Sequence, residues 1–184
     1  MSSAAFQLMY FFTQDADTNQ ASRVTNGART ILGRHGISLR IWPPAAAPIS
    51  ENVLPFNRPL DRWTEAWQPI MHIVKQERFV SVLNHWMPVI FCRYREDQSS
   101  AGSTLREPVN RLGPFVLINT RLTSETFGEV TLAHELGHAA GDLADIYELQ
   151  YSANLMFWDH GQRTGTALAA WQVKRMIEGA YFRG

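Results

Sequence analysis

Residues 134–145 read HELGHAAGDLAD. His134 and His138 are four residues apart, so on a helix they lie one turn apart on the same face and can both reach one metal ion. Glu135 projects beside them, where its carboxylate can take a proton from metal-activated water. The spacing therefore predicts an active-site helix with one catalytic zinc ion (Zn²⁺), and hydrolysis of a peptide bond is the reaction that this chemistry favours.

The same three residues can also occur on an inert helix, so the surrounding pattern matters. Leu132, Leu136, Ala139 and Ala140 supply an apolar face for the helix. Gly141 follows them, and glycine readily takes the left-handed conformation that ends a helix. An amphipathic helix that ends at a glycine favours a metal site over a chance match.

A catalytic zinc site has three protein ligands and one open position, so one ligand remains to be found. Asp142 has the right residue type, but on one straight helix it would lie about 12 Å along the axis from His134, too far for bonds of about 2 Å. The third ligand must come from chain that turns back after Gly141. Asp145 is the first donor beyond that turn, and we predict it as the third zinc ligand.

This stretch resembles the metzincin clan of zinc metallopeptidases. HELGHAAG at 134–141 is similar to the first part of their extended zinc motif, in which a glycine turn brings in the third ligand. NLM at 154–156 and the following FWDHGQRTGTALAAWQVKRMI are similar to the clan's Met-turn and C-terminal helix. The resemblance covers residues 134–182, about a quarter of the chain. It implies that Met156 lies beneath the zinc.

One departure from the metzincin pattern concerns the third ligand. The family's histidine, or aspartate in some members, would fall on Ala144, and Asp145 comes one residue later. Either the turn carries an extra residue or another donor is used, and Glu148 and His160 are the alternatives. Tyr147 could ligate the metal or steady an oxyanion, although packing is the commoner role of such a tyrosine.

The N-terminal part of the chain predicts a parallel pair of strands. FQLMYFF at 6–12 is short and continuously apolar, as in a buried strand. Asp17 or Thr18 can then cap a helix that runs to Gly33, and ISLRIW at 37–42 is typical of a second strand. Strand, helix and strand with short links form a βαβ unit, whose two strands are parallel.

Between this unit and the zinc helix, the prolines at 43–60 favour a surface loop and the spacing over 61–79 favours a helix. PVIFCRY at 88–94 and PFVLINT at 114–120 are expected strands, and the polar residues 95–107 an expected loop. PFVLINT resembles the edge strand on which such peptidases bind an extended substrate, with an interior strand as the alternative. A C-terminal helix is expected over 166–181 with Trp171 on its apolar face.

These elements predict one α/β (α+β) domain over residues 1–184, with a twisted, mixed but mostly parallel sheet. We expect a metzincin-like arrangement, in which an N-terminal sheet subdomain occupies residues 1–141 and a C-terminal subdomain occupies 142–184. The C-terminal part would hold the Met-turn and the last helix. A chain of 184 residues is long enough to bury one core of its own.

Composition excludes several classes of partner. The 17 basic and 17 acidic residues cancel and are scattered, so we expect neither nucleic acid nor an anionic membrane as a partner. Cys92 is the single cysteine and excludes an internal disulfide. The start of the chain resembles no signal peptide, and we expect a cytoplasmic protein unless it is exported by a non-classical route. The six tryptophans are expected mainly in the core.

The sequence thus predicts a monomeric zinc-dependent endopeptidase that acts on a protein or peptide substrate. His134, His138 and Asp145 would bind the zinc, and Glu135 would act as general base. One alternative is a catalytically inactive, zinc-stabilised module of the same fold that binds a peptide or protein. Another is a selective peptidase delivered into other cells as an effector.

Overall fold

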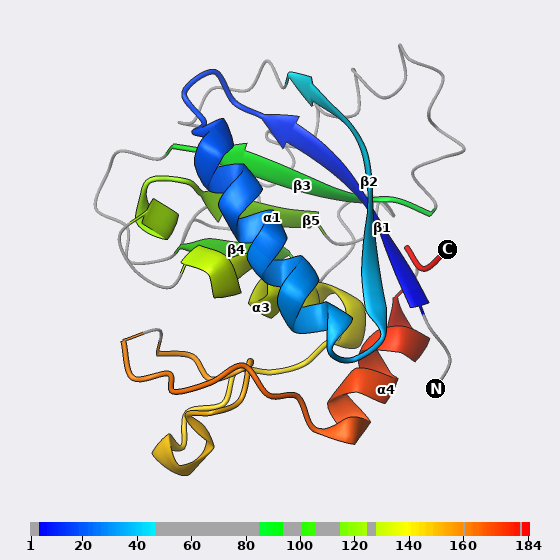
Figure 1. Cartoon of the computed structure of the whole chain (residues 1–184), viewed down its shortest axis with the longest axis vertical. Helices are drawn as coiled ribbons and strands as arrows, with labels where there is room; N and C mark the ends of the chain where they lie inside the picture. Colours follow the sequence, from blue (N-terminus) through cyan, green and yellow to red (C-terminus); the bar gives the residue numbers. More distant parts are fainter. Residues whose placement is uncertain are drawn as a thin grey trace.

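The computed structural model describes residues 4–46, 85–93, 101–105, 115–124, 128–159, 161–180 and 182–184. Within these ranges the expected α/β fold is confirmed, with five strands in one sheet of order β2-β1-β3-β5-β4 (Figure 1). The strands are β1 (Ala4–Phe12), β2 (Ile37–Ala46), β3 (Met87–Cys92), β4 (Gly102–Leu105) and β5 (Phe115–Asn119). The helices are α1 (Thr18–Gly33), α3 (Gly128–Gly141) and α4 (Ala170–Gly179), with 3-10 turns η4 (Leu122–Ser124) and η5 (Leu149–Tyr151).

The predicted βαβ unit is present. Strands β1 and β2 pair in parallel, and α1 connects them. Asp17 caps α1, because its side chain accepts hydrogen bonds from the backbone N–H groups of Asn19 and Gln20 at 2.9 and 3.1 Å. The apolar residues of α1 recur at helical spacing and are buried, namely Ala21, Val24, Ala28, Ile31 and Leu32. The helical spacing of apolar residues in the sequence was therefore sufficient to predict this βαβ unit.

Strand β2 continues to Ala46, whereas a loop was predicted from residue 43. The strand lies at an edge of the sheet, and its register with β1 shifts where Pro43 and Pro44 lie. An edge position with a bulge tolerates proline, because the missing N–H is not needed by a second neighbour. Residues 47–60 of the predicted loop and the predicted helix at 61–79 lie outside the described residues.

The other side of the sheet corrects two predictions. Strand β5, from the PFVLINT segment, is interior and pairs with β3 in parallel and with β4 in antiparallel orientation. Of the two alternatives for PFVLINT, the interior strand is therefore confirmed and the edge strand is wrong. Part of the predicted polar loop at 95–107 instead forms β4, which is the edge of the sheet in the described part of the chain. Hydrogen bonding to β5 stabilises this short strand, and its sequence alone shows little strand character.

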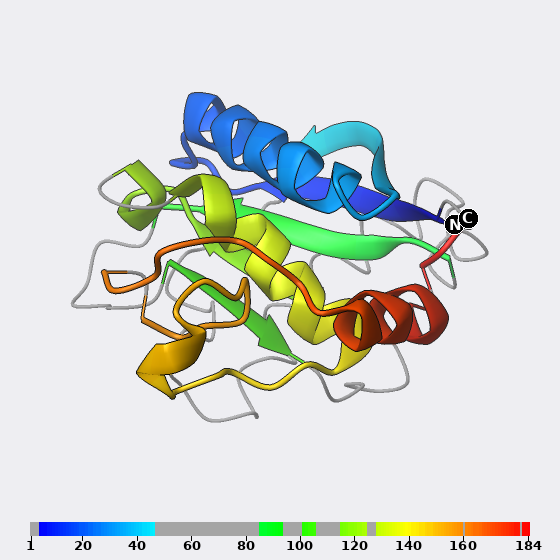
Figure 2. The ribbon, with the colours of Figure 1, turned by 60° about the horizontal axis from the view of Figure 1, so that its bottom comes forward.

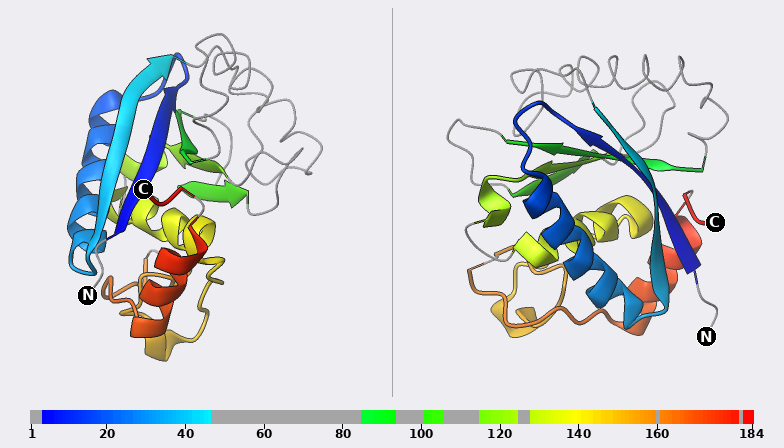
Figure 3. Two further views of the ribbon diagram at one scale, coloured as in Figure 1. Left: turned by 90° about the vertical axis from the view of Figure 1, so that its right-hand side faces the viewer. Right: turned by 45° about the horizontal axis from the view of Figure 1, so that its top comes forward.

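Helices α1 and α3 lie side by side on one face of the sheet, and α4 packs near the C-terminal end of α3 (Figures 2 and 3). The two long helices approach closely at Gly27, where a Cβ atom would overlap the backbone carbonyl of Glu129. The core between helices and sheet includes three fully buried phenylalanines, Phe6, Phe91 and Phe182. This packing fixes the position of α3 over the edge strand β4.

The C-terminal helix is shorter than predicted. It begins at Ala170 rather than near 166, and Trp171 is 60% exposed instead of lying on the buried face. Gln172 and Met176 are the buried residues of α4. The chain then returns to β1, where Phe182 packs edge-on against Phe6 with ring centroids 5.0 Å apart. No helix in the described ranges combines the length and the apolar character needed to cross a membrane.

Candidate metal centre

Helix α3 carries the two histidines of the predicted site. His134 and His138 are 5% and 6% exposed, and their Nε2 atoms lie 3.1 Å apart. The rings are nearly perpendicular, with an interplanar angle of 89°. The four-residue spacing therefore brings two imidazole nitrogens together, as one turn of helix requires.

The far side of each imidazole ring contacts a backbone carbonyl. His134 Nδ1 lies 2.9 Å from the carbonyl oxygen of Leu155, and His138 Nδ1 lies 2.6 Å from that of Leu143. A carbonyl oxygen can only accept, so either bond forms only in the tautomer that has the proton on Nδ1. The neutral rings then present an Nε2 lone pair to one another, which is the tautomer that a metal ligand needs.

The turn after α3 differs from the prediction. The residue in the left-handed conformation is Asp142, with φ of 48°, and not Gly141. Gly141 instead allows close packing against α4, because a Cβ atom there would lie 3.1 Å from Met176 Cγ and 3.2 Å from its backbone nitrogen. Relative to the metzincin pattern, the left-handed residue and the next donor, Asp145, both lie one residue later. The turn thus carries an extra residue, which is one of the two explanations that the sequence left open.

Asp145 completes the group. Its Oδ1 lies 3.2 Å from His134 Nε2 and 3.3 Å from His138 Nε2. These three residues are close enough to hold one metal ion. The alternative donor Glu148 is exposed and does not belong to the group, and His160 lies outside the described residues.

The arrangement of donor atoms fits a metal ion. Bonds of 2.0–2.1 Å in tetrahedral geometry place neighbouring donors about 3.3 Å apart, close to the three observed separations of 3.1, 3.2 and 3.3 Å. With both Nδ1 atoms protonated, all three converging atoms are acceptors, and none supplies a hydrogen to another. Acceptors packed in this way require a shared cation or added protons.

The electrostatics of the group agree with this interpretation. Burial lowers the pKa of His138, but the hydrogen bond with Asp145 and the negative charge of Glu135 outweigh burial, so the pKa is raised above its usual value. Burial raises the pKa of Asp145, but its bonds to the two histidines outweigh it and hold the pKa well below its usual range. The site therefore favours positive charge at its centre.

Glu135 is buried beside the histidines and reaches the edge strand. Its Oε2 accepts a hydrogen bond of 2.5 Å from Thr104 Oγ1 on β4. Gly102, two residues earlier on the same strand, makes room for the carboxylate, because a Cβ atom there would lie 2.7 Å from Glu135 Oε1. Sequence reasoning missed Thr104 and Gly102, since their part of the chain was expected to be a loop. Only the pairing of β4 with β5 brings them to the helix.

Met156 lies against α3 at the position between the two histidines. It is fully buried, and a Cβ atom on Gly137 would overlap its sulfur atom. The turn is held by Asn154, whose Oδ1 accepts from Met156 N at 2.9 Å and whose Nδ2 donates to Gln172 Oε1 at 2.8 Å. The methionine that resembles the Met-turn residue thus packs directly under the histidine-bearing helix.

A buried arginine also adjoins the site, and sequence reasoning missed it. Arg163 Nη2 donates to the carbonyl oxygen of Phe157 and lies 3.1 Å from His134 Nδ1. Burial lowers the pKa of Arg163 to about 10, against the opposing effect of Asp145 and Glu135. The guanidinium stays charged near neutral pH and balances part of the negative charge of the two carboxylates.

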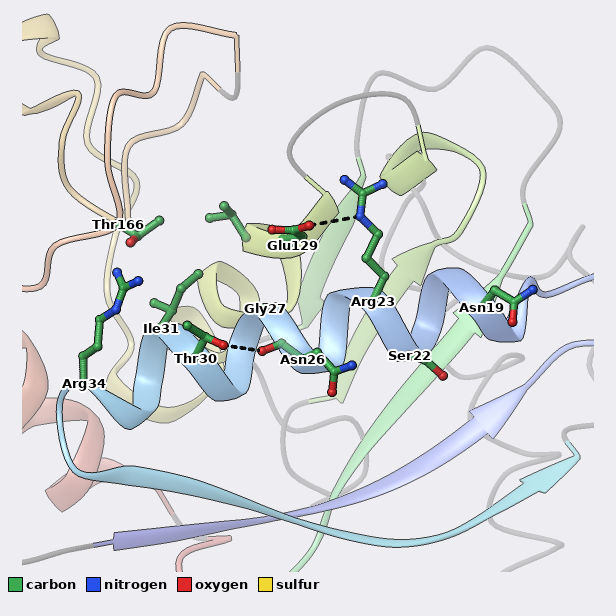
Figure 4. Close-up of a pocket in the computed structure, with 11 residues that line it drawn as sticks. Asn19, Ser22, Arg23, Asn26, Gly27, Thr30, Ile31, Arg34, Glu129 and Thr166 are labelled. Carbon is green, nitrogen blue, oxygen red and sulfur yellow. Dashed lines mark hydrogen bonds and ion pairs between the residues drawn. The ribbon is translucent and has the colours of Figure 1, made fainter.

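A separate polar groove of about 660 Å³ lies beside α1 and the start of α3 (Figure 4). An ion pair of 3.2 Å between Arg23 and Glu129 joins the two helices there. Its lining contains none of the three metal-site residues. The groove is lined by Asn19, Ser22, Arg23, Asn26, Gly27, Thr30, Ile31, Arg34, Glu129, Val130 and Thr166.

No protein-family model matches the chain, and no curated protein matches its sequence. A fold by itself does not establish an activity, so the function is argued from the chemistry of the site.

Proposed function

We propose that the protein is a zinc-dependent endopeptidase of metzincin type, with His134, His138 and Asp145 as zinc ligands and Glu135 as general base. The observation that carries the proposal is the convergence of two imidazole nitrogens and one carboxylate oxygen within 3.1–3.3 Å. Beside them lies a buried carboxylate that is not one of the three donors. The substrate would be a protein or peptide, and we propose a monomeric enzyme.

Zinc is the metal that this donor set favours. Two histidines and one carboxylate are the ligands of many catalytic zinc sites, in which the fourth position stays open. The Asp145 side chain is 31% exposed, so the site can be reached from solvent on that side. When bound, zinc would polarise the scissile carbonyl and lower the pKa of a water molecule.

The residues of the chain have distinct roles in this proposal. Glu135 would accept a proton from the attacking water and return it to the leaving amine nitrogen. The hydroxyl of Thr104 orients the Glu135 carboxylate through the 2.5 Å hydrogen bond. Strand β4 pairs only with β5 among the described strands, so its backbone can bind an extended peptide by strand addition.

The alternative is an inactive, zinc-stabilised binding module. The observation that favours it is the burial of Glu135 together with its bond to Thr104, which a purely structural carboxylate would also show. The two proposals differ in turnover and agree in zinc binding. A general base has no role in a site that only holds the fold together.

The test measures bound zinc and peptide hydrolysis for the wild type and for the Glu135→Gln variant. We expect one zinc per chain in both proteins and hydrolysis only by the wild type. Zinc without hydrolysis of any peptide in a diverse library would favour the binding module. Equal hydrolysis by both proteins would contradict the role of Glu135, and no zinc after reconstitution would contradict both proposals.

A further inference from the structure

The exposed apolar side chains gather in one segment. Five large hydrophobic side chains are exposed in the part of the chain that the structure describes, and four of them lie between positions 147 and 158. We call these four the aromatic shelf: Tyr147, Leu149, Tyr151 and Trp158. Single exposed apolar residues are normal on a globular protein, whereas a cluster marks a binding surface.

Two residues of the aromatic shelf, Tyr147 and Trp158, lie in two paired segments that also contribute residues to the metal centre. Ile146 N donates to the Met156 carbonyl at 2.8 Å, and Trp158 N donates to the Ile146 carbonyl at 3.1 Å. These bonds form a parallel bridge between Ile146 and Phe157. The bridge holds the chain around Asp145 and Tyr147 beside the chain around Met156 and Trp158.

Both segments contribute to the metal centre. One carries Asp145, whose Oδ1 lies close to both histidines, and the other carries Met156, which packs against Gly137. Two residues further along each segment are Tyr147 and Trp158, whose ring centroids lie 5.8 Å apart with an interplanar angle of 35°. The two aromatic rings therefore lie side by side next to residues of the metal centre.

The distance from Asp145 to the Tyr147–Trp158 pair can be compared with the spacing of side chains in an extended peptide substrate. Two residues of extended chain span about 6.6 Å, so the Tyr147–Trp158 pair lies about one such step beyond Asp145. A peptide bound at the metal in extended form would place a neighbouring side chain at a similar distance. Tyr147 and Trp158 are 67% and 50% exposed, so they offer their surfaces to a ligand.

We infer that the aromatic shelf determines substrate specificity by binding a bulky apolar side chain within two residues of the scissile bond. The inference rests on the proposed peptidase function and names the substrate class of the same site. Leu149 and Tyr151 on η5 are exposed as well. A flat pair of aromatic rings gains most from a large apolar partner, because burial of apolar area drives the contact.

The experiment uses peptides that differ only by Phe, Ser or Lys at each of the two positions on either side of the cleaved bond. The zinc-loaded wild type is compared with a Tyr147→Ser/Trp158→Ser double variant. The Trp171→Ser variant is the matched control, because Trp171 is 60% exposed on α4. We expect kcat/KM of the wild type to favour the Phe peptide by about tenfold, and this preference to vanish in the double variant alone.

A second measurement separates the inference from the proposed function. Calorimetric titration of the Phe and Ser peptides into zinc-loaded Glu135→Gln protein reports binding without turnover. If the wild type cleaves nothing, the peptidase proposal fails, while tighter Phe binding that depends on Tyr147 and Trp158 still supports the shelf.

Three results would contradict the proposed role of the aromatic shelf in specificity even if the protein hydrolyses peptides. One is an equal rate for the Phe and Ser peptides, and another is a preference for Lys. The third is an unchanged Phe preference in the double variant. Self-association or vesicle binding that the double variant abolishes, without any discrimination among peptides, would assign the surface to another occupant and also overturn the inference.

Discussion

Asp145 Oδ1 lies 3.2 Å from His134 Nε2, although the two residues stand on opposite sides of the turn that ends α3. The left-handed residue Asp142 reverses the chain there and returns the carboxylate to the helix face. A straight helix would have carried it about 16 Å away along the axis. The geometry of this turn is thus what makes a three-donor site possible.

Removal of the third donor should weaken the metal site without unfolding the protein. In Asp145→Ala the two histidines remain, and we expect zinc affinity to fall by at least a hundredfold. Competition with a chromophoric chelator measures the affinity. The matched control is Asp142→Asn, which removes the charge of an exposed carboxylate that pairs with Arg175 at 3.6 Å and keeps a residue type that tolerates the left-handed conformation. Equal zinc affinity in Asp145→Ala and the wild type would exclude Asp145 as a ligand.

The hydroxyl of Thr104 should matter for turnover and little for zinc. Thr104→Val keeps the shape of the side chain but removes the donor to Glu135, so we expect kcat to fall by about tenfold. Thr104→Ser retains a hydroxyl and should recover most of the activity. Steady-state kinetics and zinc content of the three proteins check this. A kcat of Thr104→Val equal to that of the wild type would show that the hydrogen bond has no part in the reaction.

Loss of the Arg163 charge should destabilise the fold around the site. Arg163→Met leaves the Phe157 carbonyl without its guanidinium donor and leaves the nearby carboxylates without a balancing charge. We expect the free energy of unfolding to fall by about 3 kcal/mol. Urea denaturation with EDTA present measures this for the metal-free protein. The exposed Arg34 provides the control, and Arg34→Met should change stability by less than about 0.5 kcal/mol.

Tyr10 should make the protein less stable at high pH. Burial raises the pKa of Tyr10 to about 12, against smaller lowering effects of the Thr25 hydrogen bond and the Arg29 charge. Its contribution is complete below the unfolded pKa of about 10 and is lost between pH 10 and 12, because only the unfolded state deprotonates there. Across that window the loss approaches about 3 kcal/mol.

Denaturation of the wild type and Tyr10→Phe at pH 9 to 11.5 tests the Tyr10 prediction. The phenyl ring of the variant has no proton to lose, so the stability difference between the two proteins should shrink as the pH rises. Parallel pH profiles would mean that Tyr10 ionises equally easily in the folded and unfolded states.

Residues whose roles depend on local spacing were predicted from the sequence. His134 and His138 meet because any helix brings residues four apart onto one face. The same holds for the βαβ unit, where the apolar period of α1 and the cap at Asp17 set the helix and its short links. Such features need only the backbone geometry of a few neighbouring residues.

Residues whose roles depend on distant chain were missed or misplaced. The sequence left an edge and an interior position open for β5, because nothing in its apolar run shows that Gly102–Leu105 will pair with it. Thr104 therefore entered the site only through sheet pairing, and Arg163 only through its burial against Phe157 and His134. Trp158 and Trp171 were expected in the core and are exposed.

Local sequence patterns were sufficient to predict the helix that carries two histidines and a carboxylate. They were also sufficient to predict the order of strand, helix and strand in the N-terminal unit. The position of the third donor, Asp145, depends on the tertiary structure. Gly141 packs closely against Met176, and the left-handed residue of the turn is Asp142. The position of strand β4 beside Glu135 also depends on the tertiary structure. The physical reason is that side-chain periodicity is a local property, whereas turn geometry and strand order depend on packing between segments far apart in the chain.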